Sequence, residues 1–167
     1  VSRLEHHQWT VPAVVHADNW ELLACPVNGP AVAARGRDAV VAWFTGAGFK
    51  ARTLVSFSND AGRSWGAPIR FDDGDPLGRV DVELLSDGSA VATWVEMHDG
   101  RGQFRLKRIQ STGAVSPPIV IAAPEVARVS GYPRMAARGE ELVFAWTESL
   151  PPGAGLSEAR SALQTAV

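Results

Sequence analysis

The chain has 167 residues, of which 46% are hydrophobic and 20% are charged. Its 16 Lys and Arg against 18 Asp and Glu give a net charge of -2, which argues against a nucleic-acid binder because such proteins need a basic surface. Its longest apolar runs, such as 39–44 and 119–123, are strand-sized, whereas a bilayer span needs roughly 20 residues. We therefore expect a single folded domain, with no nucleic-acid partner and no membrane insertion.

The sequence opens on Val1 without an initiator Met or an apolar signal core, which indicates processing or a chain that begins inside a longer gene. Cys25 is the only cysteine, so an internal disulfide or a zinc knuckle cannot form, and a small buried role is expected for it. Neither a cofactor nor a metal site is predicted, because the scattered His, Asp and Met residues match no metal-binding spacing.

The first predicted element is a strand over residues 9–15, followed by a long polar stretch to residue 30. A unit of four short strands then covers 30–71, in which β-branched and aromatic residues are separated by turns rich in Gly, Asp and Asn. A second unit of the same pattern covers 80–121, and a partial third covers 132–167. The segment 156–167 fits either a helix by composition or a third strand by position, and we favour the strand.

The three units are copies of one repeat of about fifty residues. Trp43, Trp94 and Trp146 each close the second strand of a copy, at the same distance from the start of that copy. Four antiparallel strands in about fifty residues correspond to one blade of a β-propeller. The predicted fold is therefore all-β, with about three four-stranded blades, or half of a six-bladed ring. The other half would come from a second copy, in a homodimer, or from the remainder of a longer propeller chain.

A specific motif follows the third strand of the first unit, in the segment 58–65. Its defining residues are Ser58, Asp60, Gly62, Ser64 and Trp65. Asp60 can accept hydrogen bonds from nearby amides, Gly62 permits the positive φ of a tight turn, and Trp65 can fold back as an apolar plug. This pattern resembles the Asp box of sialidases and related BNR-repeat propellers. In that family the box is structural and lies away from the active site, so the resemblance implies a structural role here.

The resemblance also implies where a ligand would bind and what the ligand would be. In such propellers the site is built from loops that enter each inner strand and loops that leave each second strand. The predicted ligand-binding residues on those loops are Asp18, Asn19, Arg79, Asp81 and Arg134. Sialidases bind a substrate carboxylate through three arginines, and a guanidinium matches a carboxylate in a bidentate way. Arg79 and Arg134 would be part of such a clamp, or alternatively surface residues that bridge blade edges.

Three residues are candidates for catalysis. Tyr132 is the only tyrosine and hence the only possible counterpart of the sialidase nucleophile, although it would serve equally as a packed aromatic residue. Glu96 and Glu148 follow Trp94 and Trp146 at the same spacing and could form the carboxylate pair that most glycosidases use. Their repeated position is equally explained by a repeated structural role.

Two functions follow from these observations. One is a sialidase-like module that binds or hydrolyses a glycan, which the family resemblance would place in a secreted or periplasmic protein. The other is a non-catalytic propeller scaffold that binds a protein or a small ligand. Turnover of a sialoside separates the two.

Overall fold

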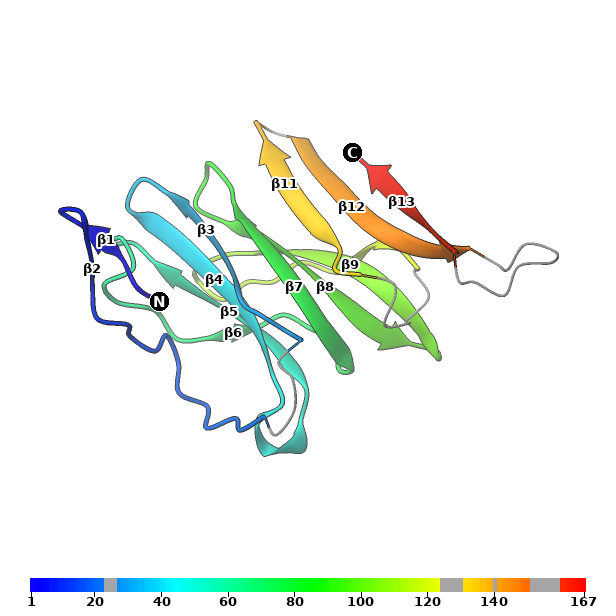
Figure 1. Ribbon diagram of the computed structural model, residues 1–167, viewed down its shortest axis with the longest axis horizontal. Helices are drawn as coiled ribbons and strands as arrows, with labels where there is room; N and C mark the ends of the chain where they lie inside the picture. Colours follow the sequence, from blue (N-terminus) through cyan, green and yellow to red (C-terminus); the bar gives the residue numbers. More distant parts are fainter. Residues whose placement is uncertain (23–26, 124–130, 140, 151–159) are drawn as a thin grey trace.

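The computed structural model describes residues 1–22, 27–123, 131–139, 141–150 and 160–167. Within these ranges the chain forms three larger antiparallel sheets, a two-stranded hairpin and a short 3-10 turn, η1 (Ala47–Phe49) (Figure 1). No helix in these ranges has the length and apolar character needed to cross a membrane. The prediction of an all-β chain of antiparallel sheets is confirmed.

Sheet 1 has the strand order β3-β4-β5-β6, and its strands follow one another along the chain. They are β3 (Ala31–Arg35), β4 (Asp38–Thr45), β5 (Arg52–Ser58) and β6 (Ile69–Arg70). The sequence predicted a four-stranded unit over 30–71 in this position. The β3–β4 turn is tight because Gly36 adopts φ 62°, a left-handed conformation that glycine tolerates.

Sheet 2 repeats this order with longer strands, β7 (Pro76–Leu84), β8 (Ala90–His98), β9 (Arg101–Ile109) and β10 (Ile119–Ala122). Its first strand is irregular, since the pairing of β7 with β8 shifts between Pro76 and Gly78 and again between Gly78 and Asp81. The sequence analysis placed the start of this unit at residue 80. It missed the bulged beginning of β7 because Pro76 and Gly78 are poor strand formers.

Sheet 3 contains β11 (Arg134–Arg138), β12 (Glu141–Leu150) and β13 (Arg160–Ala166) in that order. For residues 160–166 the strand alternative is therefore correct and the helix is not, because β13 pairs with β12 from Phe144 to Leu150. Residues 156–159 lie outside the described ranges, as does Cys25.

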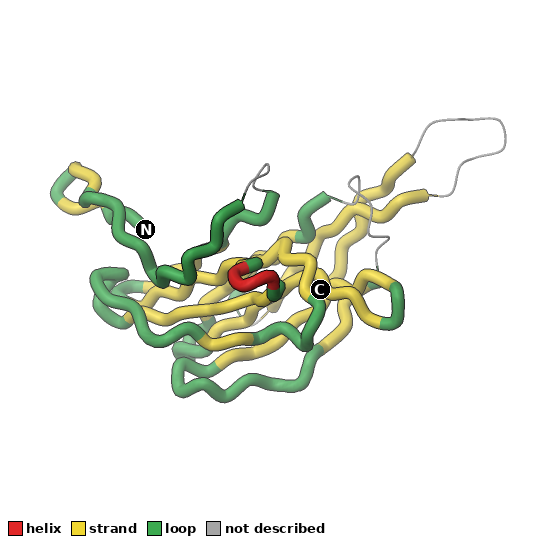
Figure 2. The backbone as a smooth tube through the Cα atoms, turned by 90° about the horizontal axis from the view of Figure 1, so that it is seen from below, coloured by secondary structure: helices red, strands yellow, loops and turns green. Residues whose placement is uncertain are grey.

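The N-terminal segment differs from the predicted outer strand over 9–15. It forms the hairpin β1 (Leu4–Glu5) and β2 (Gln8–Trp9), and its backbone bonds continue to residue 13. The amide of Thr10 donates to the carbonyl of Arg3, and the amide of Ala13 donates to that of Val1, both at 2.8 Å. The segment thus pairs with the first residues of the chain. Pro12 has no amide hydrogen to donate, which makes this segment a poor outer strand of another sheet. It then runs along one side of the sheets (Figure 2).

Sheet 2 is packed on both faces, and the alternation of side chains along β8 explains how. Ala92 and Trp94, both fully buried, belong to the core shared with sheet 1. Val91 points the other way and packs with Phe104 and Phe144 in the core shared with sheet 3. Successive strand residues face opposite sides of a sheet, so a strand buried on both sides must be apolar on both. That is the arrangement of a blade stacked between two neighbouring blades.

The first strands of the three sheets are neighbours in space. β7 lies beside β3 and β4 on one side and contacts β11 on the other (Figure 1). Blades that surround a common axis place their inner strands in this way.

The segment 58–65, which resembles an Asp box and is called by that name below, adopts the geometry that its residues predict. The Asp60 carboxylate accepts bonds from the Ser64 hydroxyl at 2.6 Å, the Ser64 amide at 2.9 Å and the Arg63 amide at 2.8 Å. These bonds, with that of the Ser64 hydroxyl first, hold the pKa of Asp60 well below its ordinary value. Gly62 has φ 74° and donates its amide to the Ser58 hydroxyl at 2.9 Å. All the acceptor capacity of Asp60 serves the turn, as expected of a structural residue.

Candidate ligand-binding face

The antiparallel order brings one set of connections to the same end of the sheets. These are the β4–β5 loop, the β6–β7 loop, the β8–β9 turn and the chain segments that lead into β3 and β11. We call this end the loop face. The opposite end carries the Asp box and the β3–β4 and β7–β8 turns, and we call it the Asp-box face. All eight site residues that the sequence proposed outside the Asp box belong to the loop face or to the strands that lead to it.

Four of these residues meet where β7 passes β11. The guanidinium carbon of Arg79 lies 5.7 Å from the centre of the Tyr132 ring, in a cation–π arrangement. Two residues further along the chain from each of these, Arg134 Nε lies 3.3 Å from Asp81 Oδ2. Tyr132 and Arg134 are both exposed, at 46% for the whole tyrosine and 69% for the arginine side chain. An aromatic ring and two guanidinium groups thus lie together at the surface.

Asp81 itself is buried, and its carboxylate joins sheet 2 to sheet 3. Its Oδ2 accepts the amide of Met135 at 2.9 Å, and its Oδ1 accepts the amide of Val82 at 3.1 Å. A buried carboxylate that accepts backbone amides positions the strands around it. Asp81 therefore positions Arg134 through the ion pair between their side chains.

Asn28 holds the bulge of β7 from the neighbouring loop. Its Nδ2 donates to the carbonyl of Leu77 at 3.1 Å, and its Oδ1 accepts the amide of Arg79 at 2.9 Å. The side-chain amide thus replaces a strand partner on both sides of Gly78. Gly78 has φ 85°, and a Cβ there would lie 2.6 Å from the Asn28 side chain. Glycine is required at this position both by the backbone and by the close approach of Asn28.

The structure gives Asp18 and Asn19 a local role in the loop before β3. Asp18 Oδ1 accepts the amide of Trp20 at 3.1 Å, and Asn19 is exposed with φ 56°, a conformation that asparagine tolerates. The turn directs Trp20 onto sheet 1, where its ring meets Phe44 edge to face, with 5.6 Å between centroids. Trp20 also lies so close to Gly46 that a Cβ there would be 2.9 Å from its Nε1.

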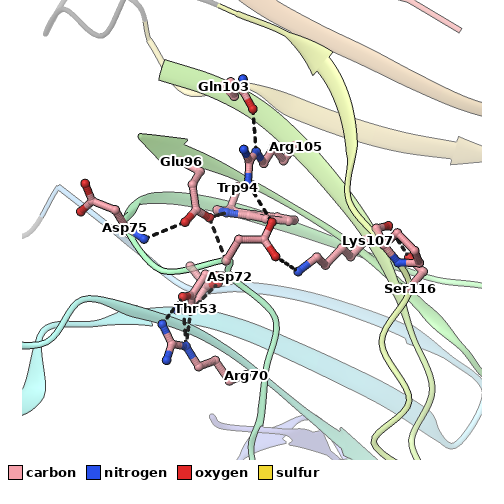
Figure 3. Close-up of polar contacts among 12 residues, drawn as sticks. Thr53, Arg70, Asp72, Asp75, Trp94, Glu96, Gln103, Arg105, Lys107 and Ser116 are labelled. Atoms are coloured by element: carbon pink, nitrogen blue, oxygen red, sulfur yellow. Dashed lines mark hydrogen bonds and ion pairs between the residues drawn. The ribbon is translucent and has the colours of Figure 1, made fainter. Parts of the chain in front are cut away.

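Glu96 lies in a buried polar network beneath the loop face (Figure 3). Only 1% of this residue is exposed. Its carboxylate accepts the amide of Asp75 at 2.7 Å, the amide of Asp73 at 3.1 Å and the indole N–H of Trp94. The two amides fix the β6–β7 loop on sheet 2, and the indole holds the carboxylate from its own strand. Glu148, its counterpart in the repeat, is exposed on β12 opposite Ala162.

Two cations of β9 complete the network around Asp73. Arg105 Nη1 donates to Asp73 Oδ2 at 2.8 Å, and the Lys107 ammonium is paired with Asp73 Oδ1. Both cations are buried, and Lys107 also lies 5.4 Å from the centre of the Trp94 ring. On the side of sheet 1, Asp72 accepts the amide of Thr53 at 2.7 Å. The buried charges are therefore paired, as burial in a low-dielectric interior requires.

Arg70 forms a fork on the carboxylate of Asp72, with its Nε 3.0 Å from both oxygens. This hydrogen bonding raises the pKa of Arg70 above its ordinary value. The pair is therefore locally neutral.

A cavity of about 610 Å³ opens on the loop face between the β4–β5 and β6–β7 loops. It is lined by Phe49, Lys50, Arg52, Arg70, Gly74 and Asp75. None of these residues was among the site residues that the sequence predicted. Lys50 and Arg52 follow a turn whose sequence is typical of a surface loop. Their sequence therefore does not indicate that they line a cavity. The acidic cluster Asp72, Asp73 and Asp75, and the alternation of Arg105 and Lys107 with apolar residues on β9, could have indicated the buried network.

Within the described residues, no group of three His, Cys, Asp or Glu side chains is arranged to hold a metal ion.

Comparison with protein-family models gives no match, and comparison with curated proteins gives none either. Among solved structures, the chain is similar to a xylan β-1,4-xylosidase from Bacillus halodurans C-125, with a TM-score of 0.59 and 10% sequence identity. The overlay covers 95% of this chain and 32% of the xylosidase, so the chain spans about a third of that protein's length. This neighbour is a propeller glycosidase, and the likeness shows a fold of that kind. Ring closure and the number of blades stay predictions.

Proposed function

We propose that this chain is a propeller module of the glycosidase-like kind whose loop face binds an acidic sugar. The observation that carries the proposal is the cluster of Arg79, Tyr132 and Arg134, in which Tyr132 and Arg134 are exposed and Arg79 is half-buried, at the place where β7 passes β11. Guanidinium groups match a carboxylate by charge and by geometry, and an aromatic ring offers an apolar surface to the ring of a sugar. The sialidase-like Asp box is compatible with this ligand class.

The buried carboxylates already accept hydrogen bonds from the protein itself, which favours binding of a sugar without its hydrolysis. A glycosidase needs two carboxyl groups that reach the same bond, about 5 to 10 Å apart. Glu96 is buried and committed to three donors, while Asp81 is buried and committed to two backbone amides. Glu148 is exposed on β12, and among the described residues it does not take part in that network. Glu96 and Asp81 are better suited to holding the sheets together than to proton transfer.

The test is a titration of the purified protein with N-acetylneuraminic acid and D-galacturonic acid, followed by calorimetry or NMR. We expect both acids to bind and the neutral sugars N-acetylglucosamine and xylose to bind at least about tenfold more weakly, which corresponds to about 1.4 kcal/mol. Arg134→Ala should weaken binding of the acids by a similar factor, and Arg134→Lys should restore part of it.

A matched control is Arg37→Ala, which removes an exposed arginine from the β3–β4 turn on the Asp-box face. It should leave the affinity unchanged. Equal affinity for acidic and neutral sugars, or an equal effect of the two arginine variants, would contradict the proposal. A fluorogenic sialoside and a fluorogenic xyloside, assayed with wild type and Tyr132→Phe, test the absence of hydrolysis separately.

A second candidate function, a scaffold that assembles with another copy of the chain, has one supporting observation. β13 has β12 as its partner on one side and no strand on its other side within the described residues, and Leu163 on this strand is 73% exposed. An open strand edge is a template for pairing. Light scattering coupled to size exclusion should then give a dimer mass that Leu163→Lys reduces to the monomer mass.

A further inference from the structure

We propose that the loop face carries a second cationic subsite, in the cavity beside Phe49 and Lys50, and that the ligand is a chain of successive acidic sugars rather than one terminal acid. This inference rests on the proposed function and names its substrate class.

The charge of the cavity is the first support. Lys50 is exposed and has no ion-pair partner in the part of the chain that the structure describes. Arg52 adds a second cation, held in place because its Nη2 donates to the carbonyl of Ala47 at 3.0 Å. Arg70 is neutralised by Asp72, and Asp75 supplies one negative charge to the lining. The cavity therefore has a net positive charge and attracts an anion.

The conformation of Phe49 is the second support. This residue is fully exposed, at 106% of its reference area, and adopts φ 59°. A bulky residue in the left-handed region is strained and is retained where the surroundings impose it. The 3-10 turn imposes it here, since the amide of Phe49 donates to the carbonyl of Gly46 at 3.1 Å. The turn thus presents an aromatic ring to solvent beside two cations, which suits a sugar ring that carries a carboxylate.

The position of the cavity relative to the first cluster is the third support. Asp75 lines the cavity, and Arg79 of the first cluster lies four residues further along the same segment. Four residues of extended chain span at most about 14 Å, so the edge of the cavity at Asp75 is within reach of an oligosaccharide that binds at Arg79. A ligand that occupies two linked subsites binds more tightly than either part alone, without any new contact.

The experiment compares D-galacturonic acid with its linear tetramer, using xylotetraose as the neutral oligosaccharide of equal length. We expect the tetramer to bind at least about tenfold more tightly than the monomer, because two subsites act together. Lys50→Ala and Phe49→Ala should each reduce the affinity for the tetramer by a larger factor than the affinity for the monomer. Arg134→Ala should weaken both ligands, and Arg37→Ala should affect neither.

The outcomes separate the inference from the function on which it rests. If Arg134→Ala lowers the affinity for the acidic monomer and tetramer and Lys50→Ala lowers neither affinity, the second subsite is overturned and the proposed function stands. If Lys50→Ala lowers the affinity for the acidic monomer and tetramer and Arg134→Ala lowers neither affinity, the proposed function fails. The site is then not the cluster of Arg79, Tyr132 and Arg134. If xylotetraose binds as tightly as the acidic tetramer, recognition of acidic sugars is overturned at both places.

Discussion

The indole N–H of Trp94 donates to the carboxylate of Glu96, two residues further along the same strand, and both side chains are almost fully buried. The tryptophan that marks the repeat in sheet 2 is therefore tied to the glutamate that the repeat suggested for catalysis. The same carboxylate also accepts hydrogen bonds from two backbone amides of the β6–β7 loop. Trp94 and Glu96 together connect the apolar core to the loop face.

Glu96→Gln should destabilise the protein, because an amide group cannot accept from three donors as a carboxylate does. We expect the free energy of unfolding to fall by about 2–4 kcal/mol, measured by urea denaturation. Glu148→Gln, at the equivalent position of sheet 3, is the matched control and should change it by less than about 0.5 kcal/mol. Equal effects of the two substitutions would contradict the structural role of Glu96.

Acid should weaken the Asp box. The pKa of Asp60 lies below its ordinary value of 3.8 in the folded protein, so on acidification the unfolded state takes up a proton before the folded state does. The stabilisation is complete above about pH 5 and is lost as the pH falls through 4 and below. Asp60→Asn should remove this part of the pH dependence, and Ser64→Ala should reduce it, in urea midpoints recorded from pH 7 to pH 2.5. Superimposable profiles of wild type and Asp60→Asn would refute the assignment.

Two glycines allow the contact with Asn28 to be separated from backbone strain. Gly78 and Gly88 have similar φ values, 85° and 81°, but a Cβ at Gly88 would meet no atom within 4 Å. Gly88→Ala should cost about 1–2 kcal/mol for the left-handed conformation alone. Gly78→Ala should cost clearly more, because the new Cβ overlaps the Asn28 side chain.

The excess for Gly78→Ala should shrink when Asn28 is also replaced by alanine, as a double-mutant cycle by denaturation would reveal. An additive cycle would mean that the two residues do not interact.

Asp81→Asn should loosen the junction between sheets 2 and 3. The Met135 amide donates to Asp81 Oδ2, and a hydrogen bond to a charged acceptor contributes about 1.5–3 kcal/mol. The hydrogen-exchange protection of the Met135 amide should fall by about 10- to 100-fold, which is that energy expressed as a ratio. The amide of Val41, in the middle of sheet 1, serves as the internal reference. Unchanged protection at Met135 would show that the Asp81 carboxylate does not hold this strand.

The repeat predicted the sheets well because it is a property of hydrophobic alternation and turn residues, which act locally. The tryptophan spacing located the second strand of each unit, and the Asp box located one turn with its hydrogen bonds. The N-terminal strand was misplaced because the segment could pair with more than one strand edge. Its pairing with residues 1–3 depends on tertiary contacts, which local sequence does not reveal. The start of β7 was missed because Asn28, from a loop distant in the sequence, forms the hydrogen bonds to Leu77 and Arg79 that hold the bulge at Gly78.

The candidate site was less accessible to prediction. Sequence analysis named Arg79, Tyr132, Asp81 and Arg134 from their place before inner strands, and the structure brings these four together. It could not distinguish a buried glutamate from an exposed one, since Glu96 and Glu148 follow their tryptophans identically. Their difference arises from the β6–β7 loop that covers Glu96, and burial of this kind depends on contacts between distant segments.

The double-sided packing of sheet 2 has a consequence for how the protein comes apart. Loss of sheet 3 would leave Phe104 and Leu106 without cover, and loss of sheet 1 would uncover Trp94. Exposing these side chains costs about 25 cal/mol per Å² of apolar surface, which disfavours both partially dissociated forms in water. Melting should therefore be a single cooperative transition, and a truncated form without residues 131–167 should aggregate rather than persist as a two-sheet fragment.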